Sequence, residues 1–116
     1  MTQKSPITTH ILDTAHGRPA ANVAVSLEHQ GSKGWVEVGS GLTNDDGRLT
    51  TLLDGDSELM AGIYRINFDV GTYYEKQGQE CFYPSAQISF WVKNPDEHYH
   101  VPLLISGFGY STYRGS

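Results

Sequence analysis

Apolar and polar residues alternate along most of this chain, and this period of two restricts its fold more than any other feature. The alternation is clearest over Tyr64–Val70, where every second side chain would face a hydrophobic core. In an amphipathic helix the apolar positions would instead recur about every three or four residues. The pattern therefore predicts a protein built mainly of β-strands.

The same alternation returns between clusters of turn residues. Val23–Leu27 and Trp35–Val38 flank the glycine-containing segment Gly31–Gly34, so these two segments predict a β-hairpin. Three further strands are expected toward the C-terminus, over residues 88–92, 99–105 and 110–114. The first two of them are separated by the turn-forming residues Asn94–Glu97.

Two segments add a turn and a helix to this scheme. Asn44–Gly47 contains residues that tolerate left-handed backbone angles, so it predicts a turn that places Arg48 before a strand over Leu49–Leu53. Gly71–Gln79 lacks alternation and contains good helix formers, so one short helix is expected there. With about eight short strands in all, the sequence predicts an all-β fold, a two-sheet β-sandwich with one short helix.

Length and charge limit the domain organisation and the partners. The 116 residues suffice for a single domain over 1–116, with residues 1–5 as a flexible N-terminus. A net charge of −5 and only 8 lysines and arginines argue against nucleic acid as a partner. The chain shows neither a membrane-spanning apolar stretch nor a signal peptide, so we expect no membrane partner and a cytoplasmic location, unless a leader peptide has been removed.

Histidines are the residues best suited to acid–base chemistry here. His98 and His100 share one face of the expected strand with Pro102 and Leu104, and this unusually apolar outer face indicates an association surface. A positioned imidazole can take a proton from water as the water attacks a carbonyl carbon. By spacing alone, any pair of His10, His98 and His100 could form such a site, belong to a metal site, or be unrelated. A zinc site would need a further ligand, which the sequence does not offer, so no metal is expected.

Four motifs resemble those of a known family: Thr8–Asp13 (TTHILD), Asp45–Arg48 (DDGR), His98–Leu104 (HYHVPLL) and the C-terminal Tyr113–Ser116 (YRGS). In these motifs, and over nearly its whole length, the chain resembles the 5-hydroxyisourate hydrolases, the enzymatic branch of the transthyretin-like proteins. The resemblance implies a transthyretin-like sandwich that assembles as a homotetramer, a dimer of dimers, with a central channel lined by the sheet that carries His100. It also implies catalysis without a metal or other cofactor.

The resemblance gives roles to individual residues. The implied catalytic residues are His10, Arg48, His100 and Ser116. The implied substrate-binding residues are His10, Arg48, Tyr113 and Arg114. His98 is expected to cap the turn before its strand or to face solvent. Without the resemblance, Arg48 would be taken for an ordinary solvated residue after a turn.

The expected reaction is hydrolysis of 5-hydroxyisourate, a small molecule formed in urate (purine) catabolism. Opening of its six-membered ring gives 2-oxo-4-hydroxy-4-carboxy-5-ureidoimidazoline. The alternative is a noncatalytic carrier similar to transthyretin, which would bind an apolar ligand in the channel of the tetramer. Such carriers lack the combination of His10, Arg48, His100 and the terminal YRGS motif, which this chain retains.

Overall fold

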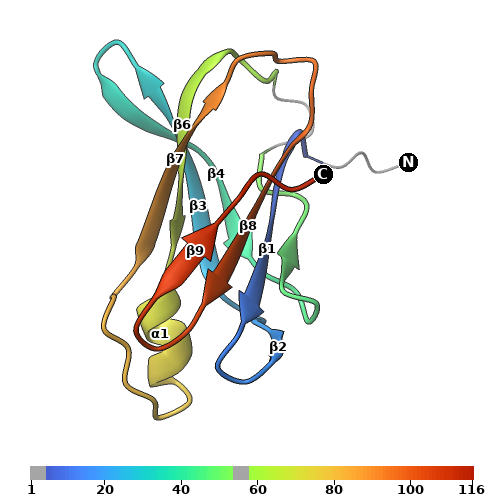
Figure 1. The fold of residues 1–116 in the computed structure, drawn as a ribbon. Helices are drawn as coiled ribbons and strands as arrows, with labels where there is room; N and C mark the ends of the chain where they lie inside the picture. The colour runs from blue at the N-terminus through green and yellow to red at the C-terminus, as the bar shows by residue number, and fades with distance from the viewer. Residues whose placement is uncertain (1–4, 54–57) are drawn as a thin grey trace.

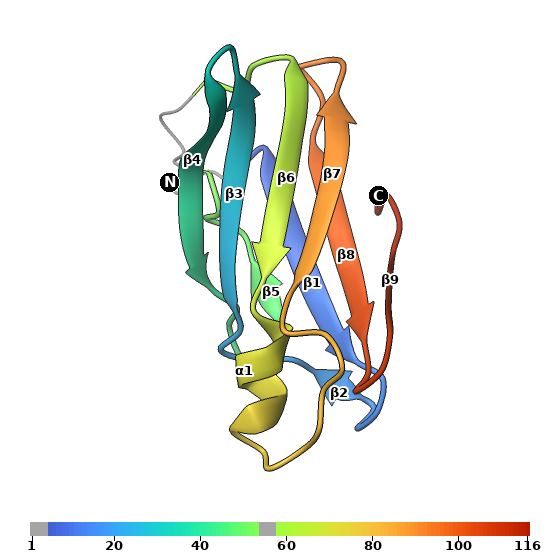
Figure 2. The ribbon, with the colours of Figure 1, turned by 90° about the vertical axis from the view of Figure 1, so that its left-hand side faces the viewer.

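The computed structural model describes residues 5–53 and 58–116 of the chain. Within them, two β-sheets pack face to face and one short helix lies at an end of the sandwich (Figure 1, Figure 2). The predicted all-β sandwich is therefore confirmed. The described residues form nine strands rather than about eight, because β2 (Arg18–Pro19) is a pair of residues too short to show alternation. The strand β5 (Arg48–Leu49) is equally short.

The first sheet carries the residues of interest for function. Its longer strands are β1 (Ile7–Asp13), β8 (Tyr99–Ile105) and β9 (Tyr110–Thr112). The strand order is β2-β1-β8-β9, and β5 pairs with β1 in addition. β1 and β8 run parallel, and their register places Thr8 beside His100 and His10 beside Pro102. Segments from both ends of the chain thus lie side by side at the centre of this sheet.

The second sheet is antiparallel throughout. Its strands, in spatial order, are β4 (Gly34–Leu42), β3 (Ala24–Gly31), β6 (Gly62–Phe68) and β7 (Ala86–Val92). β3 and β4 form the predicted hairpin, and β6 is the strand for which alternation was clearest. The strands expected at residues 88–92 and 99–105 are also present, as β7 and β8.

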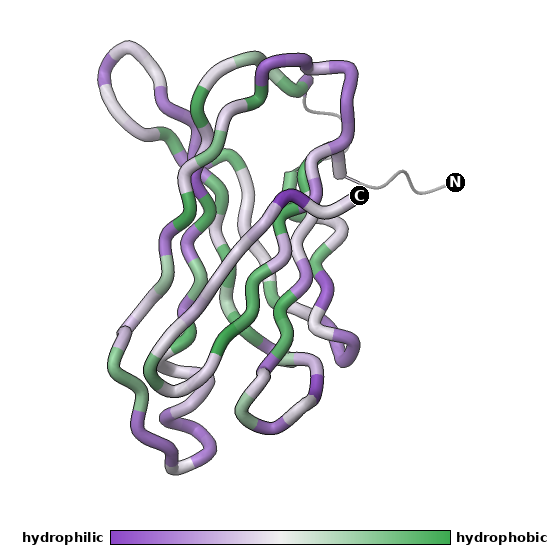
Figure 3. The backbone as a smooth tube through the Cα atoms, viewed as in Figure 1, coloured by the Kyte–Doolittle hydropathy of each residue, from purple (hydrophilic) through white to green (hydrophobic). Residues whose placement is uncertain are grey.

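The core lies between the two sheets and follows the alternation. In β6 the buried residues are Tyr64, Ile66 and Phe68, and in β8 every second residue from Tyr99 to Ile105 is buried. Figure 3 shows hydrophobic residues along the strands and hydrophilic ones in the connection between β7 and β8. Burial of each large apolar side chain contributes about 1.5–3 kcal/mol, so this core dominates the stability of the fold.

The helix α1 (Val70–Glu75) begins where β6 ends. The Asp69 side chain accepts a hydrogen bond from the Thr72 amide at 3.3 Å, which is a typical N-cap contact. The prediction of a helix over Gly71–Gln79 was correct in place but too long at its C-terminal end. Gly78 has a φ of 69°, a left-handed conformation that cannot continue a right-handed helix.

A buried carboxylate ties this helix to the first sheet. Asp13, at the end of β1, accepts hydrogen bonds from the hydroxyls of Tyr73 at 2.8 Å and Tyr74 at 2.9 Å. It also accepts from the amides of Ala15 and His16, and its other oxygen lies 2.6 Å from His16 Nδ1. Because each of these groups satisfies part of the buried carboxylate, Asp13 connects β1, the following turn and α1.

Two expectations about chain segments differ from the structure. The strand predicted over Leu49–Leu53 includes only Leu49, in β5, because Leu52 and Leu53 are both buried and so do not alternate. Ser5 does not belong to a flexible N-terminus: it is buried, and its hydroxyl accepts hydrogen bonds from the amides of Ile7 and Leu53. Residues 1–4 of that expectation lie outside the described residues.

The described residues include no helix that is both long and apolar enough to cross a membrane.

Candidate active site

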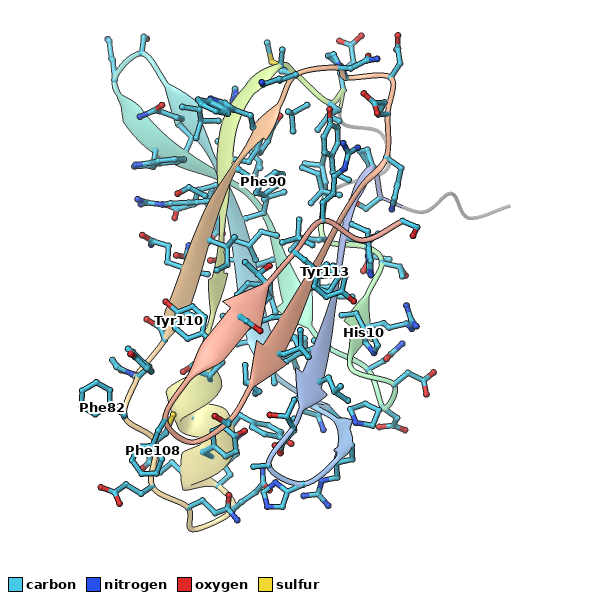
Figure 4. All side chains as sticks on the ribbon, in the orientation of Figure 1. His10, Phe82, Phe90, Phe108, Tyr110 and Tyr113 are labelled. Carbon is cyan, nitrogen blue, oxygen red and sulfur yellow. The ribbon has the colours of Figure 1, made fainter. Side chains whose placement is uncertain are left out.

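The candidate site is on the outer face of the first sheet. β1 and β5 are antiparallel neighbours, and His10 stands directly opposite Arg48 in their register. Side chains directly opposite each other in antiparallel strands have Cβ atoms about 4.5–5.5 Å apart. Figure 4 shows His10 projecting from β1 on the side away from the second sheet. The turn over Asn44–Gly47 delivers Arg48 to this position, as the sequence predicted.

The surroundings of His10 favour its neutral form. Burial lowers the pKa of the His10 imidazole, and the positive charge of Arg48 lowers it further. A hydrogen bond with the backbone of Asp46 and the charge of that residue act in the opposite direction but do not prevail. A neutral imidazole at neutral pH can accept a proton, so His10 has the electrostatic setting of a general base.

His100 lies on the same face, on the strand next to His10. Thr8 is its register partner across the parallel pair of β1 and β8, so His10 and His100 are diagonal neighbours. Neighbouring strands lie about 4.8 Å apart and two residues span about 6.6 Å along a strand, so the two Cα atoms are roughly 8 Å apart, a separation that a small substrate can bridge. The structure therefore brings His10, Arg48 and His100 together on three adjacent strands.

Thr8 is the residue that the sequence analysis overlooked. Its hydroxyl lies 2.8 Å from His100 Nδ1 and 3.0 Å from His98 Nε2, so one buried hydroxyl contacts both histidines. His98 is exposed, as expected, but it also takes part in this contact rather than only facing solvent. The available signal was the position of Thr8 two residues before His10, which puts both on one face of the strand.

The C-terminal segment returns across β8 after β9. Gly115 forms a bridge with His100, and its amide donates a hydrogen bond to the His100 carbonyl at 2.9 Å. Gly115 also lies next to Pro102, which is buried. From the sequence, Pro102 was expected on an apolar outer face open to association with another copy, but within one copy of the chain the terminal segment covers it. Ser116 directly follows the bridge and is exposed.

Arg114 points toward the start of β8 rather than toward His10. Its Nη2 lies 3.4 Å from Glu97 Oε1 and 3.3 Å from the His98 carbonyl oxygen, and its guanidinium lies over the Tyr99 ring. Tyr113, labelled in Figure 4, is exposed in the segment that follows β9. The expected last strand over residues 110–114 accordingly ends earlier, at Thr112.

A cavity of about 290 Å³ lies beside the terminal segment, between β7 and the two strands β8 and β9. Its lining includes His100, Tyr113 and Arg114 together with Phe90 and Trp91 of β7. His10 and Arg48 do not line it. The expected site residues therefore fall into two neighbouring groups, and His100 belongs to both.

The described part of the chain shows no cluster of side chains suited to bind a metal ion. Residues 5–53 and 58–116 contain no group of three or more His, Cys, Asp or Glu side chains that could hold a metal ion. The facing nitrogens of His98 and His100 both contact the hydroxyl of Thr8. The face offers a neutral imidazole, a second imidazole and a guanidinium, a set suited to proton transfer and to binding an anion.

A two-sheet sandwich with this order of strands is the fold of the transthyretin-like proteins. The model of the HIUase/Transthyretin family matches residues 7–115. The chain is 41% identical to 5-hydroxyisourate hydrolase of Mus musculus over 99% of this chain and 98% of the mouse protein. This protein therefore belongs to the HIUase/Transthyretin family.

Solved structures from both branches of the family have this fold. The structure of Klebsiella pneumoniae 5-hydroxyisourate hydrolase matches with a TM-score of 0.82 and 37% identity, covering 95% of this chain and 92% of the other. Sea bream transthyretin in complex with thyroxine matches with a TM-score of 0.88 and 32% identity, covering 96% and 95% of the two chains. Backbone similarity is thus high to both kinds of protein and does not decide the function.

Proposed function

We propose that this protein is a 5-hydroxyisourate hydrolase that opens the six-membered ring of its substrate in urate catabolism. The observation that carries the proposal is the convergence of His10, Arg48 and His100 on one sheet face, with the terminal YRGS motif across His100. The identity to the mouse and Klebsiella hydrolases is also higher than that to sea bream transthyretin.

The proposed reaction is direct hydrolysis of a ring amide by water. The water oxygen attacks the ring carbonyl carbon while an imidazole takes one of the water protons. The carbon–nitrogen bond then breaks, the ring nitrogen leaves with a proton, and the carbonyl carbon becomes a carboxylic acid. His10 is suited to accept the water proton because its surroundings hold it neutral, and His100 positions the water or returns the proton.

Arg48 is proposed to stabilise the negative charge that develops on the carbonyl oxygen. A guanidinium always carries its charge and can donate two parallel hydrogen bonds to a planar, oxygen-rich heterocycle. Ser116 and Tyr113 would complete the polar contacts to the substrate from the terminal segment. Arg114 is proposed as a second binding residue, and its contacts with Glu97 and Tyr99 hold it at the edge of this face.

A homotetramer, built as a dimer of dimers, is part of the proposal. β9 and β7 lie at the same open side of the sandwich, each at an edge of its sheet, where another copy could continue the hydrogen bonding. Phe108 and Tyr110, beside and within β9, expose large aromatic surfaces. We further propose a single domain with a cytoplasmic location, since the reaction needs no membrane.

The test generates 5-hydroxyisourate in place with urate oxidase and follows its ultraviolet absorbance with and without the protein. Decay well above the spontaneous rate is expected for the wild-type chain. Removal of residues 113–116, His10→Asn and Arg48→Gln should each abolish the acceleration while circular dichroism shows an intact fold. Arg18→Gln is the matched control, because Arg18 lies on β2 of the same sheet and contacts Gln77, away from the site.

The rival function is that of a noncatalytic carrier, favoured by the high TM-score to the thyroxine complex of sea bream transthyretin. A carrier would leave 5-hydroxyisourate at its spontaneous rate of decay and would bind thyroxine with an affinity independent of His10. Titration with thyroxine, followed by quenching of tryptophan fluorescence, separates the two cases. Wild-type protein that is folded and tetrameric but does not accelerate decay would exclude the hydrolase.

A further inference from the structure

A single buried hydroxyl stands between two histidines at the candidate site. Thr8 Oγ1 is 2.8 Å from His100 Nδ1 and 3.0 Å from His98 Nε2, and both distances are those of hydrogen bonds. Thr8 lies on β1 and His100 on β8, and His98 is the residue immediately before β8. The side chain of Thr8 is buried, whereas that of His98 is exposed.

The chemistry of a hydroxyl restricts how the two rings are protonated. A threonine hydroxyl has one proton to donate and can accept through its oxygen. If the hydroxyl donates to His100 Nδ1, that nitrogen is unprotonated, and His98 donates from its protonated Nε2 to the hydroxyl oxygen. If it donates to His98 Nε2, His100 carries its proton on Nδ1, and the lone pair is on Nε2. The hydroxyl oxygen has two lone pairs and could accept from both rings, but the proton of this buried hydroxyl would then lack an acceptor. With both hydrogen bonds formed between neutral rings, the favoured state therefore has a proton on only one of the two facing nitrogens.

We propose that Thr8 is a positioning residue that couples the tautomer of His100 to that of His98 through its shared hydroxyl. This inference rests on the proposed hydrolase function only for its consequence in catalysis. The second arrangement leaves His100 with an unprotonated Nε2, the form in which it can take a proton from water. His98 then acts on the reaction through Thr8 and His100, and it needs no contact with the substrate.

The adjacent residue shows what a purely structural threonine looks like on this strand. Thr9 is also buried, and its hydroxyl donates to the Val101 backbone carbonyl at 2.6 Å, on the core side of the sheet. That contact supports the pairing of β1 with β8 and reaches no titratable group. Thr9→Val is therefore a matched control for Thr8→Val, since both changes remove a hydroxyl with little change in shape.

The direct test observes the ring nitrogens by NMR of protein labelled with ¹⁵N-histidine, at about pH 8, where an ordinary imidazole is neutral. Signals are assigned with His98→Ala and His100→Asn. The proposal expects complementary tautomers, with one of His100 Nδ1 and His98 Nε2 protonated and the other bare. Thr8→Val should change the His100 nitrogen shifts, and Thr9→Val should leave them in place. Both facing nitrogens protonated, or both bare, would overturn the coupling.

Kinetics then separate a positioning role from a structural one. Thr8→Val should lower kcat about 10- to 100-fold with KM within about twofold, because the group that is misplaced acts in the chemical step. Thr8→Ser restores the hydroxyl and should bring kcat back to within about threefold of wild type. If Thr8→Val retains the wild-type kcat, Thr8 does not position His100.

A variant at the exposed position keeps the test decisive if Thr8→Val does not fold. His98→Ala removes one side of the bridge without entering the core, and it should shift the His100 Nδ1 signal. An unchanged His100 signal in that variant would overturn the proposal. A wild-type protein without hydrolase activity would refute the proposed function alone, because the nitrogen shifts decide the coupling without any substrate.

Discussion

Gly115 lies against the imidazole ring of His100. Its amide donates to the His100 carbonyl, and a Cβ atom at position 115 would be 2.5 Å from His100 Cδ2 and 3.1 Å from Pro102 Cγ. The absence of a side chain is therefore what allows the terminal segment to lie across the strand. Gly115 therefore packs closely against His100, one of the proposed catalytic residues.

Gly115→Ala should separate the terminus from His100. The added methyl group must displace the ring or the terminal segment, and we expect the rate of 5-hydroxyisourate hydrolysis to fall about 10-fold or more. The free energy of unfolding should change by less than about 1 kcal/mol, because the segment is at the surface. Gly109→Ala is the control, since a Cβ there meets nothing closer than 3.8 Å. Equal rates for Gly115→Ala and wild type would show that the fit has no bearing on catalysis.

The pKa of His10 should depend on Arg48. Burial and the Arg48 charge hold this pKa below the ordinary value of about 6.5, so His10 stays neutral to lower pH. Arg48→Gln removes the charge and should raise the midpoint of the His10 titration, measured by NMR. Arg18→Gln should leave it unchanged. A midpoint in Arg48→Gln that equals the wild-type value would contradict the assigned electrostatic coupling.

The same shift has a consequence for stability. Because the folded state disfavours protonated His10, the unfolded chain binds the proton more readily, and the fold loses stability as pH falls below about 6.5 toward the lower folded-state pKa. His10→Gln should flatten this part of the stability profile, measured by urea unfolding at several pH values. In the same window, the acid limb of kcat/KM should follow the titration of His10.

Much of the fold could be predicted because alternation is a local property of the chain. Tyr64–Val70 showed its burial pattern directly, and β6 follows it up to Phe68. Predictions were wrong where a distant segment decides the outcome. Ser5 is ordered by contacts with Leu53, and Pro102 is covered by Gly115. Sequence periodicity contains no information about such long-range contacts.

The residues proposed for the site could be named from the sequence, but their arrangement in space could not. His10, Arg48 and His100 were named through family motifs, and strand pairing brings them together. The shared hydroxyl of Thr8 depends on the parallel register of β1 and β8, which no local pattern specifies. The contacts that hold Arg114 toward Glu97 were likewise unpredictable, because they join the terminus to a turn.

Asp13→Asn should destabilise the fold. Burial alone would raise the pKa of the Asp13 carboxyl, but hydrogen bonds from His16, Tyr73 and Tyr74 outweigh it and lower this pKa. In asparagine, an NH2 group replaces one carboxylate oxygen, so a donor would face groups that now donate to Asp13. We therefore expect the free energy of unfolding to fall by about 2–4 kcal/mol at neutral pH. Urea unfolding measures it, and Asp96→Asn, in an exposed turn, should change it by less than about 0.5 kcal/mol.

The difference between wild type and Asp13→Asn should itself depend on pH. A carboxylate with a lowered folded-state pKa contributes its full stability above the unfolded value of about 3.9 and loses it as pH falls through the folded-state pKa. The two proteins should therefore converge in stability at strongly acidic pH. A constant difference down to that range would show that packing, rather than charge, explains the loss.

Glu97→Gln should have only a small effect, although Glu97 contacts Arg114 of the terminal motif. The two side chains are 50% and 56% exposed and their charged atoms are 3.4 Å apart, and ion pairs of this kind contribute about 0–1 kcal/mol. Arg114 keeps its hydrogen bond to the His98 carbonyl and its position over Tyr99 in this variant. We expect hydrolysis within about threefold of wild type for Glu97→Gln and a loss of about 10-fold or more for Arg114→Ala, which removes every one of these contacts. Losses of equal size in the two variants would instead identify the charge of Glu97 as what places Arg114.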